Sequence, residues 1–204
     1  TSGATVSVDN AGLIRSTDGR GIDSKSDGED LSHFVISNQA GALIQGTNDG
    51  LRLQTNPLAG GSLKIINAGT IESTVDGQAI DLESLNNPAF TTTLLNQAGG
   101  VIHAVGNDAI KTGSNATITN YGLIYTDTAQ QDKNGLDQKY DGIKIGTSTG
   151  VTVHNYGTIS ADRHGVDLKT DATLYNYEGA SITGRNGSGF GSCPLFTSDA
   201  AAGE

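Results

Sequence analysis

Short runs of alternating apolar and polar residues recur along the chain, and between them there is no helical spacing of apolar residues. Each unit begins with an alternating run that ends in Asn, continues through one or two residues and a Gly, and enters a second run that contains Ile. A third short run follows a turn rich in Asp, Asn and Gly. A period of two is typical of a strand with one buried face, so the pattern predicts three short strands per unit.

The unit occurs seven times, and every copy has the Asn, the Gly and the Ile. The asparagines are Asn10, Asn38, Asn67, Asn96, Asn120, Asn155 and Asn176. The glycines are Gly12, Gly41, Gly69, Gly99, Gly122, Gly157 and Gly179. The isoleucines are Ile14, Ile44, Ile71, Ile102, Ile124, Ile159 and Ile182.

Three strands in a unit as short as about 20 residues, without helices between them, are typical of a stacked solenoid. The sequence therefore predicts an all-β fold, a right-handed parallel β-helix of about seven rungs with three strands each. We expect the asparagines to form a hydrogen-bonded ladder along one corner, because a side-chain amide can bond both its own turn and the next rung. Asn also tolerates a left-handed backbone, and we expect the glycines to supply the positive φ of these corners.

A resemblance follows from the repeated segments at 67–71 (NAGTI), 120–124 (NYGLI) and 155–159 (NYGTI), each followed by Asp-Gly-Ile or a close variant. They resemble the β-helical passenger of Gram-negative autotransporters. The resemblance covers about residues 5–192, and it implies a secreted or surface-displayed rod that is exported across the outer membrane. Residues 1–192 are then one passenger segment, and residues 193–204 a frayed or capping tail.

The charge balance narrows the partners. The chain has 12 Lys plus Arg against 22 Asp plus Glu, a net charge of −10, and no basic stripe, which argues against nucleic acid. No apolar run is long enough to insert this segment into a membrane. Cys193 is the one cysteine, so an intramolecular disulfide is excluded and we assign that residue no metal or nucleophile role.

Insertions are the natural binding elements of a solenoid. Those at 25–32, 55–62 and 84–91 follow the third strand of successive rungs, so we expect them to lie side by side. The longest insertion, at 126–140, separates the second and third strands of the fifth rung. We predict that these loops present a partner surface to a protein or glycan on a host or neighbouring cell.

Outward positions should form columns along the rod. The second-strand column places Glu72, His103 and Tyr125 on consecutive rungs, where they either perform acid–base or metal chemistry or, as we favour, form cross-rung pairs. The third-strand column has mixed charges that we read as a solvated ladder. Its members are Asp23, Arg52, Asp81, Lys111, Lys144 and Asp167.

The first-strand column places Ile66 and Leu95 outward on adjacent rungs, where either a loop covers them, which we favour, or they form an apolar patch. Aromatic residues then gather on the last three rungs, and either stabilise the rod by stacking or form a platform for sugars. They are Tyr121, Tyr156 and Tyr177, with His154 and Tyr175 nearby.

We expect no metal and no cofactor. An acidic stretch could hold calcium, but it has neither the Gly-Gly-x-Gly-x-Asp repeat nor the spacing of an EF-hand loop, so we read it as a solvated turn. Its carboxylates are Asp18, Asp23, Asp27, Glu29 and Asp30.

Three functions remain. The favoured one is a surface rod that presents loops for adhesion or ligand binding. A carbohydrate-active, pectinase-like β-helix is the alternative, because residues 141–145 and 163–166 faintly resemble rung motifs of such enzymes. Glycoside hydrolysis needs two convergent carboxylates, and Arg52, Lys111 and Lys144 interrupt the relevant column, so we expect no enzyme. Capture of a nutrient or cofactor is the third function.

The two ends lead to one further expectation. Val6, the first inward residue, comes almost at the start of the chain, so we expect further rungs before residue 1, or packing of this end on another chain with weak self-association. At the other end, Phe190, Leu195 and Phe196 are expected to fold over the core as a lid.

Overall fold

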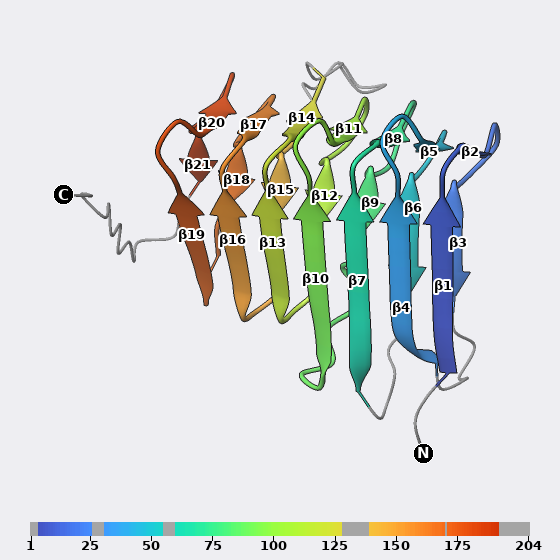
Figure 1. Ribbon diagram of the computed structural model, residues 1–204. Helices are drawn as coiled ribbons and strands as arrows, with labels where there is room; N and C mark the ends of the chain where they lie inside the picture. The colour runs from blue at the N-terminus through green and yellow to red at the C-terminus, as the bar shows by residue number, and fades with distance from the viewer. Residues whose placement is uncertain (1–3, 26–30, 55–59, 128–138, 170, 192–204) are drawn as a thin grey trace, which may run out of the picture.

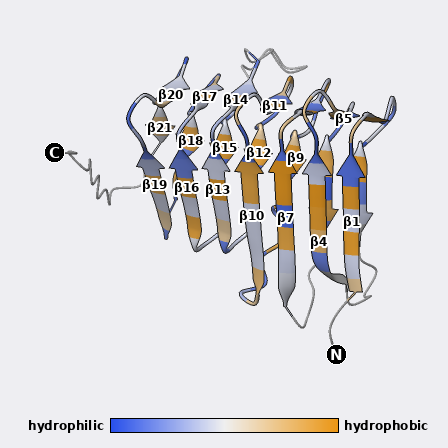
Figure 2. Ribbon diagram, viewed as in Figure 1, coloured by the Kyte–Doolittle hydropathy of each residue, from blue (hydrophilic) through white to orange (hydrophobic). Residues whose placement is uncertain are grey.

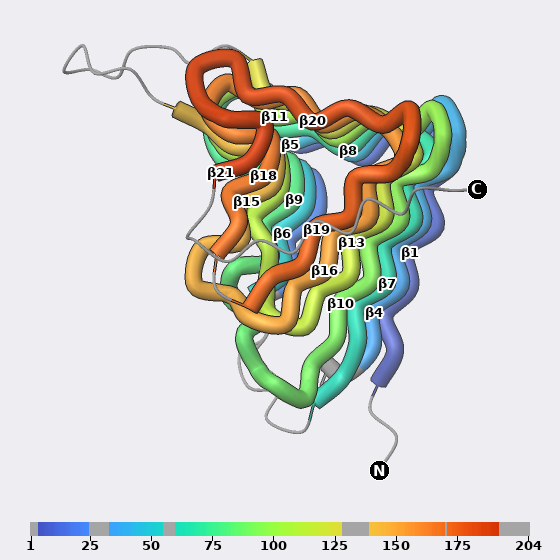
Figure 3. The backbone as a smooth tube through the Cα atoms, turned by 90° about the vertical axis from the view of Figure 1, so that its left-hand side faces the viewer, coloured from blue at the N-terminus to red at the C-terminus, as the bar shows by residue number. Residues whose placement is uncertain are grey.

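The computed structural model describes residues 4–25, 31–54, 60–127, 139–169 and 171–191. These residues form strands, turns and connecting segments, and the strands make three parallel sheets of seven strands each. Each sheet takes one strand from every rung, and Figure 3 shows the three sheets as the three sides of a stacked coil. The predicted parallel β-helix of seven three-stranded rungs is confirmed.

The first sheet contains the longest strands. They are β1 (Ala4–Asn10), β4 (Leu31–Asn38), β7 (Gly61–Asn67), β10 (Phe90–Asn96), β13 (Ala116–Asn120), β16 (Val151–Asn155) and β19 (Ala172–Asn176). Those of the second sheet are β2 (Leu13–Arg15), β5 (Leu43–Gly46), β8 (Thr70–Ser73), β11 (Val101–Ala104), β14 (Leu123–Thr126), β17 (Thr158–Ala161) and β20 (Ser181–Gly184). Those of the third are β3 (Ile22–Lys25), β6 (Leu51–Gln54), β9 (Ile80–Asp81), β12 (Ile110–Lys111), β15 (Ile143–Lys144), β18 (Val166–Asp167) and β21 (Phe190–Gly191).

The first corner joins the first and second strands of a rung, the second corner joins the second and third, and a connector leads to the next rung. The register agrees with all three predicted outward columns. In the first sheet Ile66 pairs with Leu95, in the second Glu72 pairs with His103, and in the third Asp81 pairs with Lys111.

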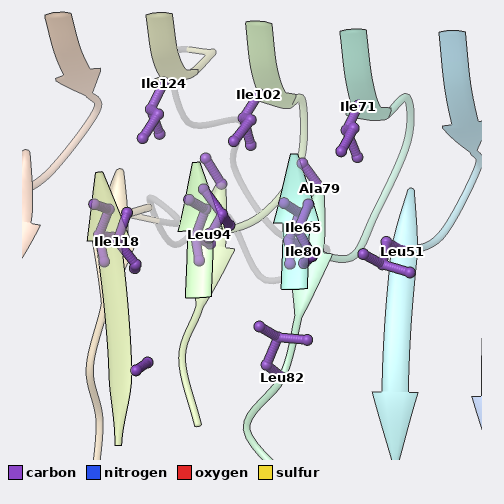
Figure 4. Packing of buried hydrophobic residues seen from close by; sticks show 14 of the residues in the cluster. Leu51, Ile65, Ile71, Ala79, Ile80, Leu82, Leu94, Ile102, Ile118 and Ile124 are labelled. Atoms are coloured by element: carbon purple, nitrogen blue, oxygen red, sulfur yellow. The ribbon is translucent and has the colours of Figure 1, made fainter. Parts of the chain in front are cut away.

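The core lies between the three sheets and consists of the inward residues of each strand. The second-strand isoleucines at 44, 71, 102, 124 and 159 are fully buried, and Ile14 and Ile182 in the end rungs are partly buried. In Figure 4, Ile71, Ile102 and Ile124 stand in one row, one from each of three neighbouring strands. Figure 2 shows the strongest hydrophobic colour across β4, β7 and β10, whereas β19 is mostly pale or blue.

Amide side chains form a continuous ladder along the first corner. The Nδ2 atom of each Asn donates to the Oδ1 atom of the Asn in the next rung, from Asn10 to Asn176, at 2.8 Å in every step. The same Nδ2 atoms also donate to backbone carbonyls, as Asn67 does to Val101 at 3.1 Å. Six of the seven are buried, so the ladder satisfies turn carbonyls that water does not reach.

The role expected for the corner glycines is only partly right. Positive φ angles occur at Gly41, Gly99 and Gly179, where two residues separate Asn from Gly. In the shorter corners at Gly69, Gly122 and Gly157 the reason for glycine is space, because a Cβ atom on Gly122 would lie 2.2 Å from the carbonyl oxygen of Gly100. At Gly12, in the first rung, nothing lies within 4 Å of such an atom. No ladder Asn uses the left-handed backbone that this residue tolerates, since the described non-glycine residues with positive φ are Asn115 and Asp171.

The insertion at 84–91 is not simply a solvated loop. Leu85 and Phe90 are fully buried, and Phe90 is the first residue of β10, so this connector extends the core. Figure 1 shows that β1, β4, β7 and β10 reach lower than β13, β16 and β19. The rod therefore narrows at a step after the fourth rung.

The seventh rung also differs from the expectation. Phe190 belongs to β21 and pairs with Val166 of β18, so it continues the third sheet at the inward position of the last rung and is not part of a separate lid. Leu195 and Phe196 lie outside the described residues. So do Cys193, Asp27, Glu29 and Asp30, and most of the insertions at 25–32, 55–62 and 126–140.

Candidate functional site

Five aromatic rings gather at the first corner of the last three rungs. This cluster, the aromatic corner, consists of Tyr121, His154, Tyr156, Tyr175 and Tyr177. Tyr156 stacks on Tyr121 with ring centroids 4.7 Å apart, and on Tyr177 at 4.0 Å. His154 stacks on Tyr175 at 4.9 Å, and its Nδ1 atom lies 3.0 Å from the Tyr177 hydroxyl oxygen. The contact between His154 and Tyr177 thus links the stack of Tyr121, Tyr156 and Tyr177 to the stacked pair of His154 and Tyr175.

The aromatic corner is open to solvent at its edges. Tyr121, Tyr156 and Tyr175 are 48%, 39% and 40% exposed. Both ring faces of Tyr156 are covered by its neighbours, so its exposed part is the ring edge and the hydroxyl group. The hydrogen bond with Tyr177 raises the pKa of Tyr156 above its ordinary value of 10.0. At neutral pH the exposed part of Tyr156 is therefore a ring edge and a neutral hydroxyl group.

A second group lies on the outer face of the second sheet, where Glu72, His103 and Tyr125 are brought together as predicted by the column. His103 Nε2 lies 3.0 Å from Asp127 Oδ1, and His103 Nδ1 lies 3.5 Å from Glu72 Oε2. The His103 ring stacks on Tyr125 at 4.1 Å, and Gln45 donates to Glu72. Burial raises the pKa of Tyr125, and Asp127 and Glu72 add to this effect. The polar atoms of Gln45, Glu72, His103 and Asp127 pair across neighbouring rungs, which agrees with cross-rung pairing.

Ile66 and Leu95 are adjacent in register and half-buried on the outer face of the first sheet. Ser37 precedes them in the column and Thr119 follows. The apolar surface that they leave to solvent is thus small and flanked by polar residues.

Sequence reasoning missed three buried carboxylates at the second corner. Asp49, Asp108 and Asp141 are at most 2% exposed and each precedes a third-sheet strand by two residues. Each accepts a backbone N–H of the following rung: Gln78 donates to Asp49 at 3.0 Å, the Asp141 amide to Asp108 at 2.8 Å, and His164 to Asp141 at 3.2 Å. They serve as turn acceptors between rungs.

Each of these carboxylates also has a cation. Arg20 Nε lies 2.7 Å from Asp49, and Lys144 Nζ lies 3.1 Å from Asp108. Arg163 donates to both oxygens of Asp141, with its Nε atom at 2.8 Å from Oδ1. Burial raises the pKa of Asp108, and the hydrogen bond with Asp141 raises the pKa of Arg163. The segments 141–145 and 163–166 therefore meet in an ion pair between buried Asp141 and Arg163.

Members of the third-sheet column form ion pairs with one another or with nearby residues. Arg52 donates to both oxygens of Asp23 at 3.1 Å, Lys169 lies 3.0 Å from Asp167, and Lys111 pairs with Glu83. Among the described residues, no group of three or more His, Cys, Asp or Glu side chains has the arrangement of a metal site.

A groove of about 370 Å³ lies beside the step in the rod. One wall belongs to the connector at 82–89, with Glu83, Ser84 and Asn86. The rest of the lining belongs to the fourth and fifth rungs, with Lys111, Thr112 and residues 145–147. The sequence analysis predicted the insertion at 84–91 as a binding element, and its residues Ser84 and Asn86 line this groove. The sequence of the insertion does not indicate that the surface beside it is concave.

Comparison with protein families finds that residues 27–168 match the model of the BigA fourth domain. The match covers well over half of the chain. The chain belongs to the BigA fourth-domain family. Membership of this family indicates that the chain is part of a bacterial surface protein. Searches of curated proteins and of solved structures find no match.

The BigA fourth-domain match ends in the sixth rung. It includes the group around His103, the buried carboxylates at 49, 108 and 141, and the groove at the step. Of the aromatic corner it includes Tyr121, His154 and Tyr156, whereas Tyr175 and Tyr177 follow the matched region. In the described ranges no helix is long and apolar enough to cross a membrane.

Proposed function

We propose that this chain is a non-catalytic, adhesive segment of an exported bacterial surface protein of the autotransporter type, and that its aromatic corner contacts a protein on a host or neighbouring cell. The observation that carries the proposal is the exposure of Tyr121, Tyr156 and Tyr175 on a rod of a bacterial surface protein family. Tyrosine is enriched at the centre of protein interfaces, where its ring is buried and its hydroxyl group is hydrogen-bonded.

The stacking geometry favours a protein over a glycan at Tyr156, the middle ring of its column. A sugar ring binds an aromatic ring through the face, and the two faces of Tyr156 are already occupied by Tyr121 and Tyr177. Ring edges and hydroxyl groups can still insert between side chains of a protein. Because the rings support one another, the surface is preorganised and little side-chain entropy is lost on binding.

The carboxylates support a role without catalysis. Hydrolysis of a glycosidic bond requires one carboxyl group as acid and a second as base or nucleophile, both open to the substrate. Asp49, Asp108 and Asp141 are buried, bonded to backbone amides and paired with cations. Display outside the cell agrees with the lack of a cysteine pair, because a chain without disulfides can cross a membrane unfolded.

The test is binding of the purified chain to cultured host cells and to an array of host surface proteins. A Tyr121→Ser/Tyr175→Ser variant should bind at least about tenfold more weakly. The matched control is Leu13→Ser/Val75→Ser, which removes two exposed apolar side chains, 58% and 63% exposed, from other rungs. We expect the control to bind like the unmodified chain.

Equal binding by both variants, or binding to no protein on the array, would refute the aromatic corner as the contact surface. Catalysis is tested separately by incubation with acidic polysaccharides. We expect no reducing ends and no unsaturated uronates. Release of either product, abolished by Asp81→Asn or Asp167→Asn, would establish an enzyme.

A further inference from the structure

The groove at the step is a concave site apart from the aromatic corner. It lies beside the connector between the third and first sheets, whereas the aromatic corner lies between the first and second sheets. The connector at 82–89 projects where the rod narrows, and the turns of the next two rungs are shorter (Figures 1 and 3). The result is an open groove of about 370 Å³, within the range of small-molecule sites.

The projecting wall is held in place by the core. Leu85 is fully buried, and its backbone carbonyl accepts a hydrogen bond from the Ser114 amide at 2.9 Å. The Ser114 hydroxyl group donates to Asn86 Oδ1 at 3.1 Å. Asn115 Nδ2 lies 3.2 Å from the carbonyl of Pro88 and 3.3 Å from that of Phe90. These contacts fix the wall before any ligand arrives, which reduces the entropy cost of binding.

The lining is polar and carries no net charge. Lys111 and Glu83 form an ion pair on it, and their side chains are 26% and 50% exposed. Ser84, Asn86 and Thr147 add hydroxyl and amide groups. The site thus offers an ammonium donor, a carboxylate acceptor and groups that can both donate and accept.

We propose that this groove binds one ring of a neutral sugar. Vicinal hydroxyl groups both donate and accept, so one ring can bond Lys111 and Glu83 at the same time without separating their charges. An anionic or cationic ligand would instead neutralise one member of the pair and leave the other without its partner.

The proposal is independent of the protein contact assigned to the aromatic corner. The groove holds none of the five rings of that corner, so variants at either site leave the other intact. Loss of glycan binding in the groove with retained adhesion, or the reverse, separates the two proposals.

The test is an NMR titration of the 204-residue chain with methyl glycosides of glucose, galactose, mannose and N-acetylglucosamine, up to about 50 mM. Glucuronate and glucosamine are the charged comparators. At least one neutral glycoside should shift the backbone amides of Ser84, Asn86 and Thr147. Thr147→Arg and Lys111→Met should each weaken its affinity by at least about tenfold.

The matched control is Thr149→Arg, which places the same side chain on an exposed residue of the same turn that does not line the groove. It should keep the affinity within about twofold of the unmodified chain. The proposal is wrong if no neutral glycoside shifts these amides, if a charged comparator binds more tightly, or if Thr147→Arg and Thr149→Arg have equal effects.

Discussion

At the scale of single residues, buried amide and carboxyl side chains at two corners connect the rungs. Asn96 is fully buried, accepts from Asn67 and donates to Asn120, so it bridges three rungs. Asp141 similarly joins the fifth rung to Arg163 and His164 of the sixth. Such side chains cannot exchange their partners for water, because the corners are closed.

Replacing Asn96 by Ala should lower the free energy of unfolding by about 1 to 3 kcal/mol, because the carbonyls of Gly100 and Leu123 and the amide of Asn67 lose a partner. The measurement is urea denaturation. Asn176→Ala is the control, since Asn176 is exposed at the end of the ladder and should cost less. Equal losses would mean that position in the ladder has no influence.

Asp81 leads to a prediction on pH. Burial raises its pKa above the ordinary value of 3.8, so in the interval above 3.8 the folded chain binds more protons than the unfolded chain. Stability from this group therefore falls as pH rises through that interval. An Asp81→Asn variant should gain stability relative to the unmodified chain between about pH 4 and the raised pKa, and the gain should then level off. Urea midpoints that differ by a constant amount across this range would contradict it.

The sequence revealed the role of the first-corner asparagines but not the role of the second-corner residues. The asparagines recur at one place in all seven repeats, so their ladder could be inferred. The second corner has no constant residue: Asp occurs in three of the seven rungs and four other residue types fill the rest. The residues are Arg20, Asp49, Gln78, Asp108, Asp141, His164 and Ser188. The signal that was available is the acid two residues before a third strand, as in Asp49-Gly-Leu and Asp141-Gly-Ile.

At the scale of elements, the strands vary little and the connectors distinguish the rungs. The connector at 82–89 buries Leu85 and leads into Phe90, and its carbonyls accept from Asn115. Its core residues were not recognisable in advance, because a connector breaks the period of the repeat and leaves no register for judging which side chains face inward. The groove is concave because two connectors in neighbouring rungs differ in length. The sequence of a single connector does not reveal this difference.

A Leu85→Ala variant should therefore destabilise the chain by about 2 to 4 kcal/mol through a cavity in the core. The control is Pro88→Ala, an exposed residue of the same connector, which should change the free energy of unfolding little. Thermal and urea unfolding give both values. If Leu85→Ala behaved like the control, the connector would not be part of the core.

At the scale of the whole molecule, each strand pairs only with strands of the neighbouring rungs, and the end rungs are less buried than the middle ones. The first and last strands of the first sheet, β1 and β19, are largely exposed, whereas β7, β10, β13 and β16 alternate between buried and open positions. The fold class was readable because this nearest-neighbour stacking repeats in the sequence.

Hydrogen exchange followed by mass spectrometry should show the strongest protection in the rungs containing β7, β10 and β13, and the weakest in those containing β1 and β19. The physical reason is that an end rung opens after losing contacts on one side only. Uniform protection along the rod would indicate a single cooperative unit instead.

The direction of the hydrogen bonds in the Asn ladder makes the two ends of the rod chemically different. Every Nδ2 atom points to the following rung, so Asn10 presents its Oδ1 atom, bonded to the Gly12 amide, at one end, and Asn176 presents its Nδ2 atom, with an Ala180 carbonyl at 3.4 Å, at the other. Any rung that prolongs this ladder must arrive with the same orientation. Copies that joined through the ladder would form open head-to-tail filaments, because a symmetric pair would bring two donors or two acceptors together.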